Sequence, residues 1–315
     1  MLKLDESEIR MRREIFIHLP LPYYNGDQLI RSLLSNKGAY TSFGLNLPEP
    51  EIYRRRLSKF LTAPEDSVMS GVASEAMLKE LGVAHRKRTV ISLPGVPNKP
   101  HEIVNENGLI PGLNNVVRRM QSFFKDFEIT LLIGVVNPGH LLATLYQANA
   151  GKDVLNVKRI VESERFWSDA LGACIDEFPQ VKVLAWQHEF ATIVWPMILR
   201  TVGLVPTSRF APGSLDMAKH IISRGGVDKI ADFLRESSIK DDKGIVTSVK
   251  LFLNQLSDKN EQTRQIRIPG WSDDLMQAFN RVYEEDLRML SRESGVIFLD
   301  YRSSNLYSPN ARVGG

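Results

Sequence analysis

The chain has 315 residues, of which 43% are hydrophobic and 24% are charged, and its formal net charge is +3. This length and apolar content suffice for a large core, and the composition is that of a globular protein. A nucleic-acid binder usually carries a denser basic face than so small a charge provides. We therefore expect a folded protein with no nucleic-acid partner.

The N-terminal segment 1–13 is charged throughout and lacks the apolar core of a signal peptide. No run approaches the roughly 18 apolar residues that a transmembrane helix needs. The one cysteine, Cys174, cannot form an internal disulfide, so nothing indicates an oxidising compartment. Cys174 stands in an apolar stretch, and we interpret it as a buried side chain rather than a catalytic thiol. These features predict a cytoplasmic protein without a transmembrane segment.

Five short apolar runs, rich in Ile, Val, Leu and Phe, are spread along the chain. They do not alternate strictly with polar residues, which is typical of strands covered on both faces. In chain order the runs are Ile15–Leu19, Arg88–Leu93, Ile129–Val136, Val181–Trp186 and Val296–Asp300.

Helical patterns lie between these runs, with apolar residues recurring at the spacing of a helix face. The clearest are Gln28–Lys37, Asn115–Phe127, Ala191–Val202 and Asp274–Leu290. Strands that alternate with helices predict a three-layer α/β/α sandwich around a mostly parallel sheet of about five strands. We expect residues 1–315 to form a single domain. The polar stretch 206–269 shows helical patches without a clear strand, so we predict a helical insertion or subdomain there.

The first predicted strand runs directly into the loop 20–27 and then into a helix. In an open parallel sheet, ligands bind at the carboxyl ends of the strands. The free N–H groups at the start of the following helix favour a phosphate. The sequence therefore places a candidate ligand site at this loop, with Tyr24, Asn25, Gly26, Asp27 and Gln28 as candidate binding residues.

Three residues near the same sheet edge are candidate catalytic groups. His18, at the end of the first predicted strand, could act as a base, or it could simply be bonded to its surroundings. His188 and Glu189 follow the fourth predicted strand as an adjacent acid–base pair. Glu189 could accept a proton from a hydroxyl substrate with His188 as shuttle. Alternatively, Glu189 accepts backbone N–H bonds and holds a loop.

Other site patterns are absent from the sequence. The six histidines are scattered and no carboxylates are grouped at ligand spacing, so we predict no metal site. Neither a dinucleotide Gly-x-Gly-x-x-Gly after the first strand nor a hydrolase Gly-x-Ser-x-Gly occurs. Basic clusters at 54–56, 86–88 and 118–119 could supply phosphate contacts. For the first and third we favour the more common role, a solvated face.

The order of the segments resembles bacterial sulfotransferase-like proteins. A strand with a histidine at its end, followed by a loop and a helix, is similar to the opening of that family. Further similar segments are Gly44-Leu45, Tyr53-Arg54, Glu106 to Pro111, Leu132 to Pro138, Trp186 to Glu189, Ile193 to Pro196, Tyr283 to Asp286 and Gly295 to Phe298. The resemblance covers most of the chain and implies a P-loop-like fold and sulfonate transfer from phosphoadenosine phosphosulfate.

The loop departs from the family pattern. The family's Gly-x-x-Lys-Thr-Gly-Thr-Thr loop holds the 5′-phosphosulfate, and this chain lacks the lysine and the threonines. Asp27 would instead place a negative charge beside a phosphate, which is repulsive in a partly dry site. Pro20 and Pro22 also remove N–H donors that a phosphate cradle would use.

Two further positions of the family pattern are altered. The arginine that precedes Asn-Pro and binds the 3′-phosphate is Val136 here, which leaves Asn137 and the hydroxyl of Thr144 as the candidate contacts. An acidic pair after the second strand, suited to a general base, is replaced by Leu93 and Pro94. The sequence therefore differs from the family at the loop for the 5′-phosphosulfate, at the arginine for the 3′-phosphate and at the acidic pair that could serve as general base.

These departures predict a sulfotransferase-like protein that no longer uses phosphoadenosine phosphosulfate, needs no cofactor, and binds a glycan, a metabolite or another protein. One alternative is an active sulfotransferase or related group transferase with a rebuilt donor site, acting on a glycan or small hydroxyl acceptor. Another is a structural partner protein with a remnant cleft. Arg54 or Arg118 reaching into the loop would favour the first alternative, and a cleft filled by Tyr23 and Tyr24 would favour the second.

Overall fold

The protein is described by a computed structural model over residues 13–24, 26–64, 71–83, 88–97, 99, 102–105, 108–148, 166–207, 209–237, 239, 241–256 and 271–302. In chain order its elements are β1 (Arg13–His18), α1 (Gln28–Ser35), α2 (Lys37–Ser42), β2 (Leu45–Asn46), α3 (Pro50–Leu61), α4 (Gly71–Glu80), β3 (Arg88–Ser92), β4 (Val104–Asn105), β5 (Gly108–Leu109), α5 (Leu113–Phe123), β6 (Phe127–Val135), α6 (Pro138–Ala148), α8 (Trp167–Glu177), β7 (Lys182–Gln187), η3 (His188–Phe190), α9 (Ala191–Gly203), η4 (Ala218–His220), α10 (Arg224–Glu236), α11 (Asp242–Leu256), α12 (Asp273–Leu290) and β8 (Val296–Leu299).

Six strands form one all-parallel sheet in the order β2-β3-β1-β6-β7-β8. Five of them are the five predicted apolar runs, and β1 lies in the middle of the sheet between β3 and β6. The remaining strand, β2, has only two residues, which is too short to stand out as an apolar run. The prediction of an α/β sandwich around a mostly parallel sheet is confirmed, with one more strand than expected.

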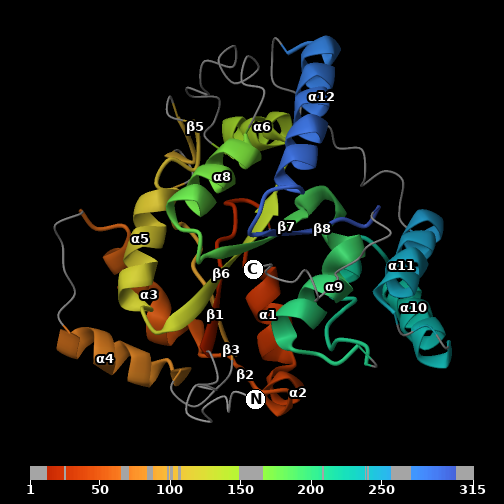
Figure 1. Ribbon diagram of the computed structural model, residues 1–315. Helices are drawn as coiled ribbons and strands as arrows, with labels where there is room; N and C mark the ends of the chain where they lie inside the picture. The colour runs from red at the N-terminus through yellow and green to blue at the C-terminus, as the bar shows by residue number, and fades with distance from the viewer. Residues whose placement is uncertain are drawn as a thin grey trace, which may run out of the picture.

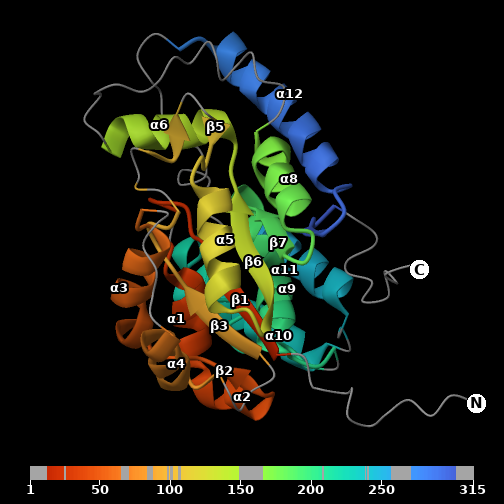
Figure 2. The same ribbon diagram turned by 60° about the vertical axis from the view of Figure 1, so that its left-hand side comes forward.

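The pleat of the strands divides the core into two halves. On β1, the buried side chains of Ile15 and Ile17 belong to one half and that of Phe16 belongs to the other. Helices α3, α5, α6, α8 and α12 cover the first face, and α1, α2 and α9 cover the second (Figure 1, Figure 2). Because helices cover both faces, successive residues of a strand are buried and the run reads as continuously apolar.

The helices depart from the prediction at several points. The helix predicted over Gln28–Lys37 is two helices, because Asn36 leaves helical geometry with φ −118° and ψ 24°. The Asn36 side-chain amide then donates to the carbonyl of Ser32 at 2.9 Å and helps to end α1. Predicted helices 115–127, 191–202 and 274–290 appear as α5, α9 and α12 with shifted ends, whereas α3, α4, α6 and α8 were not predicted.

The stretch predicted as a helical insertion contains α10 and α11 within its described part, 206–256 apart from a few positions. These two helices lie at the outer side of the sheet, beyond α9 (Figure 1). They share a small apolar cluster that includes Ile230 and Val249 and is separate from the two halves of the main core. Whether the stretch is an independent subdomain stays a prediction. No helix among the described residues has the length and apolar content to cross a bilayer.

Candidate functional site

The carboxyl ends of β1, β6 and β7 are adjacent because these strands are parallel neighbours in the sheet. His18 is the last residue of β1, Asn137 follows β6, and His188 and Glu189 follow β7. Parallel strands therefore bring candidate residues from three distant parts of the sequence to one edge. There they separate into an inner cavity, a hydrogen-bonded cluster after β6 and an outer cleft beside α1.

The inner cavity has a volume of about 30 Å³ and lies between His18, His188 and Tyr24. Gly134 on β6 makes the room for it. A Cβ atom at that position would lie 3.1 Å from the Trp186 Nε1 atom and 3.5 Å from the His188 Nδ1 atom. A cavity of this size holds a water molecule or two rather than a nucleotide.

Both imidazoles of the cavity are neutral at physiological pH. Burial lowers the pKa of His18 to about 3 and that of His188 to about 4. The Nδ1 atom of His18 lies 3.0 Å from the hydroxyl of Ser92, and its ring stacks on Trp186 with a centroid distance of 6.1 Å. His18 thus fits the anchoring role that the sequence allowed, and pKa values this low make either imidazole a weak general base.

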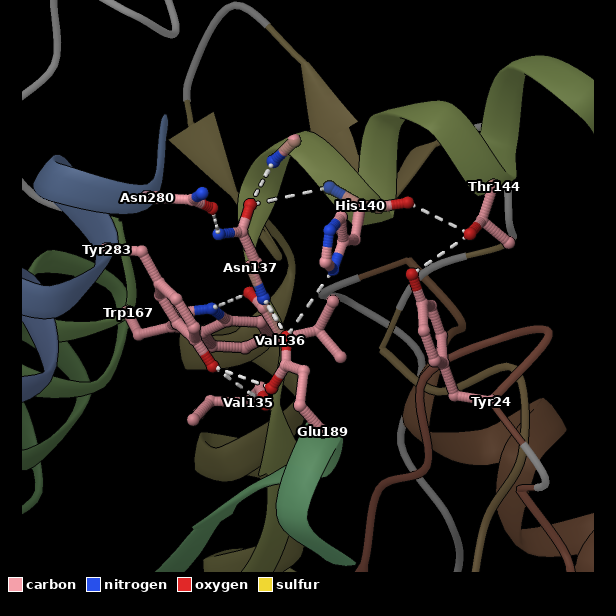
Figure 3. Close-up of polar contacts among 11 residues, drawn as sticks. Tyr24, Val135, Val136, Asn137, His140, Thr144, Trp167, Glu189, Asn280 and Tyr283 are labelled. Carbon is pink, nitrogen blue, oxygen red and sulfur yellow. Dashed lines mark hydrogen bonds and ion pairs between the residues drawn. The ribbon is translucent and has the colours of Figure 1, made fainter. Parts of the chain in front are cut away.

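The carboxylate of Glu189 belongs to the cluster after β6, which Figure 3 shows. Its carboxylate accepts hydrogen bonds from the backbone N–H of Asn137 at 2.7 Å and from the hydroxyl of Tyr283 at 3.1 Å. The His140 Nδ1 atom lies 4.0 Å from the carboxylate. Burial raises the pKa of Glu189 and raises the pKa of Tyr283 well above its ordinary value. Glu189 therefore holds a loop, and its pKa is shifted in the direction that suits a carboxylate general base.

The two other candidates near β6 are engaged in internal hydrogen bonds. The Oδ1 atom of Asn137 accepts from the N–H of Gly139 at 2.8 Å, and its Nδ2 atom donates to Asn280 at 2.8 Å. The Thr144 hydroxyl donates to the carbonyl of His140 at 2.9 Å. It also lies 3.1 Å from the hydroxyl of Tyr24, which the structure brings in from the first loop (Figure 3). Burial raises the pKa of Tyr24 to about 12, so this phenol is un-ionised.

The loop after β1 carries a forked ion pair. The guanidinium of Arg54, on α3, contacts both oxygens of Asp27, with Nη2–Oδ1 at 2.7 Å and Nη1–Oδ2 at 3.2 Å. Its Nε atom donates to the carbonyl of Ser92 at 3.0 Å. The interpretation of Arg54 as part of a solvated face is wrong, because it reaches the loop and only 23% of its side chain is exposed. Arg118, in contrast, is exposed and pairs with Glu177.

The outer cleft beside the start of α1 has a volume of about 360 Å³ and includes Tyr23, Asp27 and Gln28 in its walls. The Oε1 atom of Gln28 lies 3.3 Å from the Nε2 atom of His220. Gly26 also lines the cleft, and a Cβ atom there would lie 3.0 Å from the Cβ atom of Pro20. Tyr23 is 54% exposed, so it borders the cleft rather than filling it. The candidate Asn25 lies outside the described residues.

Two residues of α12, Tyr283 and Asp286, make contacts near the site that the sequence does not predict. Tyr283 bonds Glu189, and Asp286 accepts hydrogen bonds from the backbone N–H groups of Phe166, Trp167 and Ser168 at 2.8–3.0 Å. The Trp167 indole in turn donates to the carbonyl of Val136 at 2.8 Å. Tyr283 to Asp286 stood out in the sequence as part of the predicted helix Asp274–Leu290 and as a segment of the family resemblance. Nothing local indicates that these side chains brace the first turn of α8 and the end of β6.

No protein-family model matches the sequence, and no curated protein matches it. Among solved structures, the sulfotransferase from Alicyclobacillus acidocaldarius is similar, with 14% sequence identity, a TM-score of 0.35, and coverage of 80% of this chain and 99% of that chain. The chain is an α/β protein with a six-stranded all-parallel sheet flanked by helices, and this structural match is to a bacterial sulfotransferase, the kind of protein that the order of its segments resembles.

Proposed function

We propose that this protein binds a ligand or a protein partner and does not use phosphoadenosine phosphosulfate. The observation that carries the proposal is the ion pair between Asp27 and Arg54 in the loop after β1. Arg54 is a cation that reaches the loop where a sulfotransferase-like protein would hold the phosphosulfate. Its forked donors are taken up by a carboxylate, and that carboxylate would repel an incoming phosphate.

Two buried residues support the same conclusion. The side chain of Val136, at the position of the family's 3′-phosphate arginine, is 1% exposed and packs in the core. Leu93, at the position of the family's acidic pair, is also fully buried in the core. Neither position offers a charge to a ligand, and neither could accept an arginine or a carboxylate without burying that charge.

The alternative is a group transferase with a rebuilt donor site, and two observations favour it. The first is that Arg54 reaches the loop after β1, and the second is Glu189. A carboxylate with a raised pKa, bonded to Tyr283 at 3.1 Å and 4.0 Å from His140, has the environment of a general base. Such an enzyme would require a donor whose phosphate groups avoid Asp27. Phosphoadenosine phosphosulfate does not meet this condition while Asp27 is ionised.

Thermal unfolding in the presence of adenosine 3′,5′-bisphosphate tests the proposal. A ligand present at 100 times its dissociation constant adds about 2.7 kcal/mol of stability, which a melting curve detects easily. We expect no shift at millimolar ligand. A clear rise in melting temperature would contradict the proposal and support the transferase alternative.

Asp27→Asn sharpens this test, because it removes the negative charge and leaves the Arg54 guanidinium available to an anion. We expect this variant to gain weak affinity for adenosine 3′,5′-bisphosphate in isothermal titration. The matched control is the double variant Asp27→Asn with Arg54→Met, which should show no gain. If Asp27→Asn alone binds no better than the wild type, the charge of Asp27 is not what excludes the donor.

A further inference from the structure

The outer cleft continues along α1 as a groove. Beside the hollow of about 360 Å³ lies a second one of about 690 Å³, and the two share Gln28, Arg31 and His220 in their walls. Both volumes fall in the range of about 300–1,000 Å³ that is usual for small-molecule sites. The shared residues make the two hollows one elongated surface, suited to a chain of several units rather than to one compact molecule.

Tyr23 borders this groove in an unusual conformation. Its φ angle is 67°, in the left-handed region that costs free energy for a residue other than glycine, and 54% of the side chain is exposed. The next residue, Tyr24, is turned inward and hydrogen-bonded to Thr144. Packing therefore does not explain the placement of Tyr23. Its ring gives the cleft an accessible apolar surface beside the proline rings of Pro20 and Pro22.

The polar groups of the groove include both donors and acceptors. Arg54 fixes the orientation of the Asp27 carboxylate, which is 33% exposed and keeps lone pairs for further hydrogen bonds. Arg31 is exposed, and its guanidinium has no hydrogen-bond or ion-pair partner among the described residues. Gln28 is held by the Ser32 hydroxyl at 3.2 Å on one side and by His220 at 3.3 Å on the other. Asp27 and Gln28 are therefore held in place at the groove, whereas Arg31 can reorient toward a ligand.

The charges define which ligands suit the groove. The charges are balanced, because Asp27 is paired with Arg54 and Asp216 with Lys219, while Arg31 and Asp228 add one charge of each sign. The groove as a whole therefore favours neither an anion nor a cation. What remains is a neutral ligand that offers many hydroxyl donors and acceptors and also an apolar face for an aromatic ring. A pyranose ring has this combination, because its C–H groups form one face and its hydroxyls point outward.

We propose that the groove along α1 binds a neutral oligosaccharide, with Tyr23 as the stacking platform and Asp27 and Arg31 as partners of the hydroxyl groups. The inference rests on the proposed function, because it requires that phosphoadenosine phosphosulfate does not occupy the start of α1. To the proposed function, the inference adds that the ligand is a neutral carbohydrate.

Saturation-transfer NMR on the full chain tests the inference, with maltotetraose, cellotetraose, chitotetraose and adenosine as separate probes. We expect transfer to the ring C–H protons of at least one oligosaccharide. Tyr23→Ala should weaken that binding about tenfold, which corresponds to about 1.4 kcal/mol. Tyr23→Phe should keep it, because the ring is retained. Val72→Ala is the control, since Val72 is an 80% exposed apolar residue on α4, outside the groove.

The outcomes separate the two proposals. Absence of transfer to all three oligosaccharides overturns the inference, as does transfer that Tyr23→Ala leaves unchanged. Transfer to adenosine alone, lost in Tyr23→Ala, would mean a nucleoside site and would overturn the carbohydrate class while leaving the proposed function intact. A melting shift with adenosine 3′,5′-bisphosphate would overturn the proposed function itself. If Tyr23→Ala does not fold, Arg31→Met serves instead, with the same tenfold weakening expected.

Discussion

The segments that follow β1 and β6 reach the same edge of the sheet but are built in opposite ways. Asn137 follows β6 and its backbone N–H bonds Glu189, which follows β7; the other bonds of these two side chains go to Gly139, Asn280 and Tyr283. After β1, the ion pair of Asp27 and Arg54 is partly exposed and lines an open cleft. The number of internal partners makes the difference, because the buried Asn137 and the partly exposed Glu189 both have their polar groups taken up by the protein, whereas the Asp27 carboxylate keeps lone pairs open to the cleft. Two segments at the same edge of the sheet can therefore differ, one closed by internal hydrogen bonds and the other open to a cleft.

The largest expected loss of stability comes from removing the carboxylate of Asp286, which holds the first turn of α8 beside the end of β6. Asp286 is fully buried and accepts three backbone N–H bonds and the Ser168 hydroxyl. Asp286→Ala leaves these donors without an acceptor, so the free energy of unfolding should fall by about 3–5 kcal/mol. Urea unfolding measures the loss, with the exposed Asp126→Ala as control. A loss below about 1 kcal/mol would mean that water replaces the carboxylate and that the region is not tightly built.

The next effect concerns acid stability at the end of β1. The pKa of His18 is lowered to about 3 in the folded protein, so the unfolded chain takes up a proton first as the pH falls below 6.5. Stability is present above pH 6.5 and is lost toward pH 3, with a slope of about 1.4 kcal/mol per pH unit from this histidine. His18→Asn can keep the bond to Ser92 and should remove that slope. Urea unfolding between pH 7 and about pH 4 measures it, and His220→Asn, an exposed histidine, should leave the slope as it is.

Glu189 should respond to pH in the opposite direction. Burial raises its folded pKa above 4.5, so the folded protein keeps the proton to higher pH than the unfolded chain does. Its contribution to stability is greatest below pH 4.5 and falls as the pH rises through the folded pKa. Glu189→Gln removes this decline, so the stability of the variant relative to the wild type should increase with rising pH. Exposed Glu293→Gln is the control. A difference that does not change with pH would show that Glu189 titrates as it does in the unfolded chain.

The smallest effect is expected at the open cleft. The pair of Asp27 and Arg54 is 33% and 23% exposed, so water screens it and Asp27→Ala should cost only about 0–1 kcal/mol of stability. Arg54→Met should cost somewhat more, because Arg54 also bonds the carbonyl of Ser92. A cost above about 2 kcal/mol for Asp27→Ala would mean that the ion pair is needed to hold the loop after β1 in place. The difference between this loop and the internally bonded cluster after β6 would then not hold.

The sequence predicted the framework because its signal is local. Each of the five strands is a short run of apolar residues, as in Ile15 to Ile17, and burial on both faces leaves this mark without reference to any other segment. The departures from the family's phosphate-binding pattern are equally visible, since Asp27, Pro20 and Val136 are read directly from the chain. Strand β2 was missed because two residues carry too little pattern.

Only the tertiary structure decided which contacts the candidate site residues make. His188 and Glu189 are adjacent in the sequence, yet one lines the inner cavity and the other bonds Asn137 and Tyr283. Tyr24 meets Thr144 across 120 positions, and Arg54 meets Asp27 across 27. The physical reason is that a hydrogen bond or an ion pair depends on where the fold brings two side chains together. The apolar residues that a strand or helix buries, in contrast, recur at a regular spacing within that element. They can therefore be recognised from the local sequence alone.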